Sequence, residues 1–319
     1  MLYKSQPEDF LVEEIPLYQF TRKGEHVILK IKKRNLTTFD VIKQIASFLK
    51  IPEKLIGYAG LKDKVSVSIQ HISIPKNILG EKLDTLRKHL EERGISVLDI
   101  TEHRNKLRPG HLKGNIFTIK VKEVDNVEKV LSKLRELERY GILNYFDEQR
   151  FGKDNIEKAI SLLKEEQNKK INPYKKRLLV SSLTSLIFNE YVDERLNREL
   201  VRVLKGDIIF DQKSFKLDKA KEESEITINT IPTGPIWGSH MIEPENDILR
   251  EIEYRILEKY GLKKGDFRKL KNKGTRRPIK VYPEMLDVVE VRKKELTIRF
   301  FLPKGSYATL ILKELERVN

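Results

Sequence analysis

The chain has 319 residues, of which 39% are hydrophobic, so it can build more than one core, and two domains are expected. Cysteine is absent, which excludes disulfide scaffolds, thiolate metal sites and cysteine nucleophiles, and the six histidines lack metal-binding spacing. We expect no metal site. The formal net charge of +15, from 63 Lys and Arg against 48 Asp and Glu, favours a nucleic acid as the partner.

Membrane attachment is not indicated. No uninterrupted apolar run approaches the roughly 20 residues that span a bilayer. The N-terminal sequence MLYKSQPEDFLVEE turns acidic at once and lacks the basic start, apolar core and cleavage site of a signal peptide. We therefore expect a cytoplasmic protein without a membrane partner.

The first part of the chain predicts two strands and a helix. Residues 7–16 and 26–32 alternate apolar and polar side chains, as strands with one buried face do. A helix over residues 38–49 can be capped by Thr37 or Thr38. Its apolar stripe consists of Val41, Ile42, Ile45, Ala46 and Leu49.

The stretch GYAGLKDKVSVSIQ, residues 57–70, is the first candidate site. It presents one carboxylate, Asp63, between strand-like runs over residues 55–59 and 66–74. A carboxylate at the tip of a short loop can be held rigidly while it faces a cleft, as catalysis requires. The same residues also suit an ordinary solvated turn, because glycine and aspartate favour turns and lysines flank many exposed loops.

A helix over residues 83–90 and a strand over 95–100 lead to a run of positive charge. Arg104, Lys106 and Arg108 lie in a loop rich in proline and glycine, which suits phosphate contacts because these need charge more than exact geometry. The alternative is a solvated surface loop. A half-buried strand over residues 117–121 and an amphipathic helix over 127–137 follow.

The segment NYFDEQRFG, residues 144–152, combines aromatic, amide and basic side chains. Phe146 can stack on a base, Asn144 can hydrogen-bond to it and Arg150 can hold an RNA backbone. Alternatively, the aromatic residues are buried under a domain junction and Arg150 is in an ion pair.

Residues 153 to about 275 differ in composition from the rest. Helices over 178–196 and 248–260 are separated by strand patterns in GDIIF, residues 206–210, and EITINTI, residues 225–231. Strand alternation then returns and ends in a helix that Ser306 can cap. We expect the last strands to rejoin the first domain, which makes the middle region an insertion.

Four motifs in this order resemble the TruD family of pseudouridine synthases: AGLKDK, residues 59–64, followed by Gln70; NYFDEQRFG; RRP, residues 276–278; and FLPKGSYAT, residues 301–309. The resemblance covers nearly the whole chain. It implies an α+β fold with a pseudouridine-synthase-like core, a mixed, mostly antiparallel sheet and flanking helices, over residues 1–155 and 275–319. An inserted α/β TRUD-type domain is expected over residues 156–274. The implied activity is isomerisation of uridine to pseudouridine, usually at position 13 of tRNA.

The resemblance also assigns roles to single residues. Asp63 matches the catalytic aspartate. Asn144 and Phe146 match residues that contact and stack the target uracil, and Phe10 and Lys4 match an aromatic residue and a lysine near the active site. Apart from these matches, Arg150 is expected to bind substrate, and the contacts predicted with the RNA backbone are Lys62, Arg104, Lys106, Arg108, Arg276 and Arg277.

The implied chemistry requires neither a cofactor nor a metal, because one carboxylate can serve each step. Asp63 can attack C1′ or take a proton from C2′, and the sequence leaves both routes open. Asp147 departs from the family pattern, which has glycine there, and this puts the turn beside Phe146 in question. The expected partner is tRNA and the expected state is a monomer. The alternative function is a non-catalytic, basic RNA-binding or RNA-folding protein.

Overall fold

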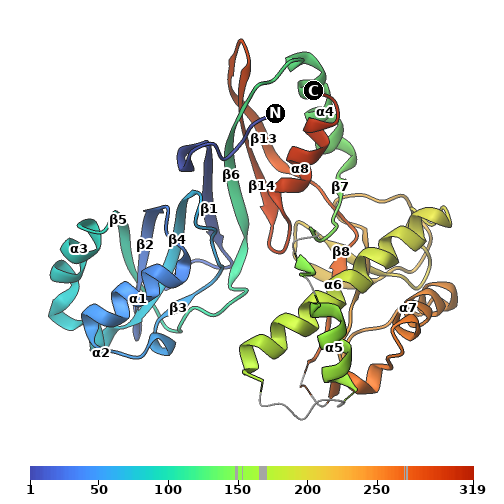
Figure 1. Ribbon diagram of the computed structural model, residues 1–319, viewed down its shortest axis with the longest axis horizontal. Helices are drawn as coiled ribbons and strands as arrows, with labels where there is room; N and C mark the ends of the chain where they lie inside the picture. The colour runs from blue at the N-terminus through green and yellow to red at the C-terminus, as the bar shows by residue number, and fades with distance from the viewer. Residues whose placement is uncertain (148–149, 153, 165–170, 269, 271) are drawn as a thin grey trace. The chain divides into compact units, whose positions relative to one another are not determined.

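The computed structural model describes residues 1–147, 150–152, 154–164, 171–268, 270 and 272–319. The chain divides into two compact units (Figure 1): unit 1 is Met1–Arg139 with Pro283–Asn319, and unit 2 is Tyr140–Tyr282. Unit 2 is therefore one continuous segment that interrupts the sequence of unit 1. Among the helices of the described residues, none has the length and apolar character needed to cross a membrane.

Unit 1 is built on an eight-stranded sheet with the order β13-β14-β6-β1-β4-β2-β5 and with β3 paired to β4. In the described sheet, β1 and β4 are parallel and the other pairs are antiparallel. This confirms the α+β fold with a mixed, mostly antiparallel sheet. The strands are β1 (Phe10–Pro16), β2 (His26–Arg34), β3 (Gly57–Tyr58), β4 (Val67–Pro75), β5 (Ile95–His103), β6 (Leu112–Lys122), β13 (Glu284–Arg292) and β14 (Glu295–Pro303).

Helix α1 (Thr38–Leu49) lies against β2 and β4 (Figure 1). Its whole predicted apolar stripe is buried in a core that it shares with residues of these strands. Its N-terminus is fixed by a capping box, in which Thr37 accepts from the Asp40 amide and Asp40 accepts from the Thr37 amide, at 3.1 and 2.7 Å. This confirms the cap at Thr37. The other α-helices of unit 1 are α2 (Lys76–Leu79), α3 (Leu83–Glu91), α4 (Val127–Tyr140), whose last residue already belongs to unit 2, and α8 (Ala308–Glu316).

The predicted cap of the last helix is wrong. Tyr307 is the N-cap of α8, and the amide of Ser306 instead donates to Pro303 O at 3.2 Å in the turn after β14. Ser306 therefore belongs to the turn and not to the helix end.

Unit 2 combines helices, among them α5, α6 and α7 (Figure 1), with strands. Its four-stranded sheet has the order β11-β10-β8-β9, and β12 and β7 form a small ladder. A strand over residues 225–231 is wrong, because the strand here is β10, which begins where that prediction ends and contains Pro232 and Pro235. The elements are β7 (Ile142–Leu143), α5 (Asn155–Leu163), α6 (Pro173–Asn197), β8 (Ile208–Asp211), β9 (Lys216–Lys219), β10 (Ile231–Ile236), α7 (Asp247–Lys259), β11 (Thr275–Pro278) and β12 (Lys280–Val281).

The unit boundaries differ from those expected from the sequence. Residues 140–155 and 275–282, which the motifs placed with the core, belong to unit 2. The reason is strand pairing, since β12 pairs with β7 and β11 pairs with β10, all within unit 2. Only β13 and β14 of the returning strands join the sheet of unit 1.

Candidate active site

Asp63 lies in the loop between β3 and β4, and its side chain is 80% exposed. The loop is wider than a tight hairpin turn, because β3 ends at Tyr58 and β4 begins at Val67. The antiparallel register Tyr58 to Ile72 still ties the start of the loop to the centre of the sheet. The loop thus presents an exposed carboxylate, while its first residues are fixed to the sheet.

Lys4 and Phe10, both predicted near the active site, lie beside Asp63. Lys4 Nζ is 3.6 Å from Asp63 Oδ2 and 4.2 Å from the centre of the Phe10 ring. Phe10 is 4% exposed and meets Phe117 edge to face, with ring centroids 6.0 Å apart. The cation therefore bridges a carboxylate and an aromatic face, an arrangement favourable to both contacts.

These three residues line one cavity of unit 1, of about 320 Å³. The turn after β14 completes its wall with Tyr307, and β6 contributes Asn115. Asn115 Oδ1 is buried and has no hydrogen-bond partner among the described residues, which is unusual for a buried acceptor. Neither residue is singled out by the sequence patterns, although Tyr307 lies within the FLPKGSYAT motif.

The base of the Asp63 loop is held by a buried ion pair. Lys62 Nζ is 3.0 Å from Glu14 Oε2, with side chains 4% and 1% exposed, and Glu14 Oε1 accepts from the His71 amide at 3.1 Å. Burial raises the pKa of Glu14, but the hydrogen bond with His71 and the charge of Lys62 outweigh burial, so the pKa lies below its ordinary value. The burial of Lys62 contradicts its expected contact with an RNA phosphate and gives it a supporting role.

Gln70, the last residue of the recognised motif, also supports the loop. Thr38 Oγ1 donates to Gln70 Oε1 at 3.0 Å and accepts from the Lys62 amide at 2.9 Å. Gln70 is fully buried. The motif thus supplies both the exposed carboxylate and the polar contacts that hold its loop.

The predicted basic loop lies between β5 and β6. Arg104 and Arg108 are exposed and Lys106 is half-buried; burial and the charge of Arg108 lower the pKa of Lys106. Lys106 and Arg108 line a second cavity of unit 1, of about 460 Å³, together with Phe39 and Tyr58. The two rings meet edge to face with centroids 6.0 Å apart. Cations beside aromatic faces suit an unpaired nucleotide, whose backbone and base they can contact.

In unit 2, Arg277 joins the two residues predicted to contact uracil. Its Nη2 donates to Asn144 Oδ1 at 2.6 Å and to Asn144 O at 2.9 Å, and its guanidinium carbon lies 3.9 Å from the centre of the Phe146 ring. Arg277 is 7% exposed and Asn144 is 1% exposed. Because Nε and Nη2 of Arg277 donate to Asn144, this geometry gives Arg277 a role in supporting Asn144 and Phe146.

Arg276 is also buried. Its Nη2 is 2.7 Å from Glu253 Oε1, with both side chains 0% exposed, so the predicted phosphate contact of Arg276 is wrong. Arg150, by contrast, is exposed and donates to Ser181 Oγ at 2.6 Å. Asp147 does not have a positive φ, so its backbone does not require the glycine expected there. Residues 148 and 149 of the same motif lie outside the described residues.

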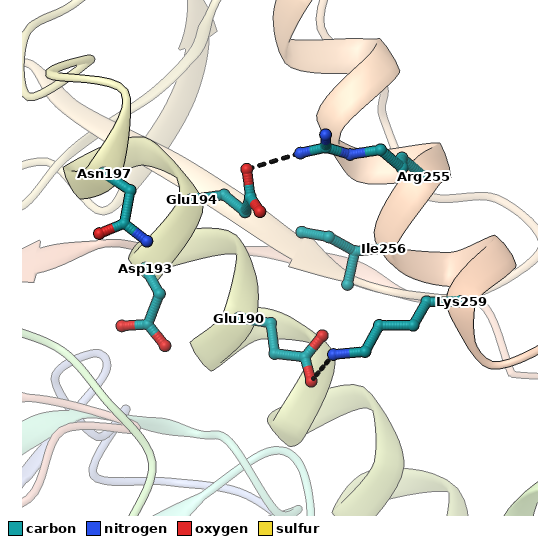
Figure 2. A pocket seen from close by; sticks show the side chains of 7 residues that line it. All are labelled: Glu190, Asp193, Glu194, Asn197, Arg255, Ile256 and Lys259. Carbon is teal, nitrogen blue, oxygen red and sulfur yellow. Dashed lines mark hydrogen bonds and ion pairs between the residues drawn. The ribbon is translucent and has the colours of Figure 1, made fainter.

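A further cavity of unit 2, of about 400 Å³, has the opposite charge character. Figure 2 shows that carboxylates of α6 face basic side chains of α7 across it. Lys259 Nζ is 2.9 Å from Glu190 Oε1, and Arg255 Nη2 is 2.6 Å from Glu194 Oε2. Because its cations are already paired with carboxylates, this cavity does not suit a phosphate.

Comparisons with known proteins agree on one family. The family model for tRNA pseudouridine synthase D (TruD) matches residues 1–174 and 164–315. The tRNA pseudouridine synthase D of Wolinella succinogenes is 33% identical over 98% of this chain and 94% of its own length. That of Thermus thermophilus is 38% identical over 98% of this chain and 88% of its own length.

A crystal structure from Methanosarcina mazei, described under the name tRNA pseudouridine synthase D, has the same fold. Its TM-score is 0.64 at 23% identity, and the match covers 99% of this chain and 93% of that chain. The family match spans both units and contains the loop that presents Asp63. The chain therefore belongs to the TruD family of tRNA pseudouridine synthases.

Proposed function

We propose that this protein isomerises uridine to pseudouridine in tRNA, at position 13, with Asp63 as the catalytic residue and without a cofactor. The observation that carries the proposal is the meeting of Asp63, Lys4 and Phe10 at one cavity. A carboxylate, a cation and an aromatic face are the groups that a detached uracil and its ribose need around them.

The reaction breaks the bond from N1 to C1′, turns the uracil, joins C5 to C1′ and releases the C5 proton. Asp63 either attacks C1′ as a nucleophile or takes the C2′ proton as a base. Because its side chain is exposed, it can reach either ribose atom of a nucleotide that has left its stack. Lys4 stabilises the carboxylate charge, while Phe10 and Asn115 face the space that the base would occupy.

RNA binding extends beyond this cavity. We assign the exposed Arg104 and Arg108 to phosphate contacts, and the cavity of Phe39 and Tyr58 to an unpaired nucleotide of the same RNA. In unit 2, which we take as the inserted TRUD-type domain, we assign the exposed Arg150 to the RNA backbone. Asn144 is 1% exposed and accepts from Arg277, so we assign it to supporting the segment of Phe146.

The test is Asp63→Asn, which preserves the size of the side chain and removes its charge. We expect the release of tritium from tRNA labelled at uridine C5 to fall by about 100- to 10,000-fold, with RNA affinity close to that of the unaltered protein. Asp99→Asn, an exposed carboxylate on β5, is the matched control and should retain full activity. Full activity of Asp63→Asn would rule out Asp63 as the catalytic residue, whereas an absence of tritium release by the unaltered protein would favour the alternative of a non-catalytic RNA-binding protein.

A further inference from the structure

A buried lysine lies under the loop that carries Asp63. Lys33 is 1% exposed and stands opposite Ser68 in the antiparallel register of β2 and β4. Its Nζ donates to Ser68 Oγ at 3.3 Å and to the carbonyl oxygen of Leu36. Burying an ammonium group opposes folding unless nearby charges and acceptors compensate. The buried position of Lys33 is therefore more readily explained by a functional role than by stability.

Two serines connect Lys33 to the main chain of Asp63. Ser68 Oγ and Ser66 Oγ are 2.9 Å apart, and Ser66 Oγ donates to Asp63 O at 3.0 Å. Each hydroxyl has a single hydrogen to donate. Because Ser66 uses its hydrogen on Asp63 O, Ser68 must donate to Ser66. The chain of hydrogen bonds therefore runs in one direction, from the buried amine to the catalytic loop.

The charges that face Lys33 come from that loop and from the start of α1. Burial, together with the positive charge of Lys62, lowers the pKa of Lys33 to about 8, while the carboxylates of Asp63 and Asp40 act in the opposite direction. Lys33 therefore interacts electrostatically with the group that we assign to catalysis, although no contact joins the two side chains directly. Lys4 lies closer to this carboxylate, with its Nζ 3.6 Å from Asp63 Oδ2.

We propose that Lys33 is a positioning residue for the reaction at Asp63. It fixes the loop through Ser68 and Ser66 and places a positive charge under the carboxylate. The inference rests on the proposed function, because it assigns Lys33 a role only through Asp63.

The lowered pKa of Lys33 also affects the stability of the fold. The lowered pKa means that between about pH 8 and the ordinary value of 10.5 the unfolded chain binds more protons at Lys33 than the folded chain does. Stability contributed by this site therefore rises with pH across that window, and below it the buried charge opposes folding. A residue that opposes folding at neutral pH is more readily explained by catalysis than by structure.

The experiment measures kcat and KM for tritium release from a tRNA transcript between about pH 6.5 and 9.5. Lys33→Met should lower kcat by about 10- to 100-fold while KM stays within about twofold, since a small displacement of a catalytic group affects the chemical step. In the unaltered protein kcat should decline above about pH 8 as Lys33 loses its charge. Lys33→Arg keeps a permanent charge, so most activity should remain and this decline should move to higher pH.

Lys30→Met is the matched control. Lys30 lies on the same strand, but its Nζ is 2.8 Å from Glu13 Oε1 in a partly exposed ion pair, so kcat and its pH profile should not change. If circular dichroism shows that Lys33→Met is unfolded, the kcat and pH profiles of Lys33→Arg and Ser66→Ala test the inference instead. Ser66→Ala removes only the hydrogen-bond link and should lower kcat without moving the decline near pH 8.

The inference is overturned if Lys33→Met keeps full kcat, or if the decline stays at the same pH in Lys33→Arg. Its failure can be distinguished from failure of the proposed function. If Asp63→Asn is active, both the catalytic role of Asp63 and the positioning role of Lys33 are rejected. If Asp63→Asn is inactive but Lys33→Met is fully active, only the role of Lys33 is rejected.

Discussion

Lys4 Nζ lies 3.6 Å from Asp63 Oδ2, in a pair whose side chains are 25% and 80% exposed. Exposed ion pairs contribute about 0–1 kcal/mol to stability. We therefore expect this pair to orient the carboxylate for the reaction and not to stabilise the fold.

Lys4→Met should therefore lower kcat for tritium release by about tenfold or more, with a melting temperature close to that of the unaltered protein. Lys4→Arg should restore part of the loss. Lys64→Met is the matched control, because Lys64 is exposed and also adjoins Asp63 in the sequence. Equal losses in Lys4→Met and Lys64→Met would show that only the net charge of the loop matters.

The buried pair of Glu14 and Lys62 makes a different prediction, about stability. Removing one partner leaves the other charge buried, so Glu14→Gln should reduce the free energy of unfolding at pH 7 by about 3–5 kcal/mol. The double variant Glu14→Gln with Lys62→Met should recover much of this loss. Urea unfolding checks both, with Glu8→Gln as the control, because Glu8 pairs with Arg34 on the surface.

The same pair determines how the fold responds to acid. Because the pKa of Glu14 is lowered on folding, its contribution to stability is fully present above its unfolded value of 4.5 and is lost as pH falls through the folded value. The unaltered protein should lose stability below about pH 4.5 more steeply than Glu14→Gln does. Parallel acid profiles would contradict the assignment.

These buried pairs also explain what the sequence could and could not predict. The stripe of α1 and its cap are local patterns, and all of them are found in the structure. Burial of charge depends on partners far away in the sequence: Glu14 is 48 residues from Lys62, and Glu253 is 23 residues from Arg276. From the sequence alone, Lys62 and Arg276 are cations that suggest phosphate contacts. In the fold, each is paired with a buried carboxylate.

The strand β10 escapes prediction for another reason. Its two prolines lack amide donors and argue against a central strand, so the alternation over residues 225–231 is the stronger signal in the sequence. In the structure, different parts of β10 pair with different strands: Ile231 and Pro232 pair with β8, and residues 233–236 pair with β11. Such a division becomes visible only when the neighbouring strands are in place.

Arg277 is the residue of unit 2 whose replacement should be most informative. Its planar guanidinium contacts both the amide and the main chain of Asn144 and lies over the Phe146 ring. Lysine cannot reproduce this geometry, so Arg277→Lys should reduce the free energy of unfolding by about 2–4 kcal/mol and lower tritium release. Arg202→Lys, at an exposed pair with Glu223, is the control. Unchanged activity in folded Arg277→Lys would mean that Asn144 and Phe146 do not need this support.

The charged surfaces of the two units should differ in their contribution to RNA binding. Arg108 is exposed beside a cavity with aromatic walls, whereas Lys259 is paired with Glu190 in the acidic cavity of Figure 2. Arg108→Ala should weaken tRNA binding and reduce the slope of log K against log salt concentration by about 1, because one phosphate contact and its released counterion are lost. Lys259→Ala should leave both quantities unchanged. Filter binding over a series of salt concentrations measures them, and an equal slope for Arg108→Ala and the unaltered protein would exclude Arg108 from the RNA interface.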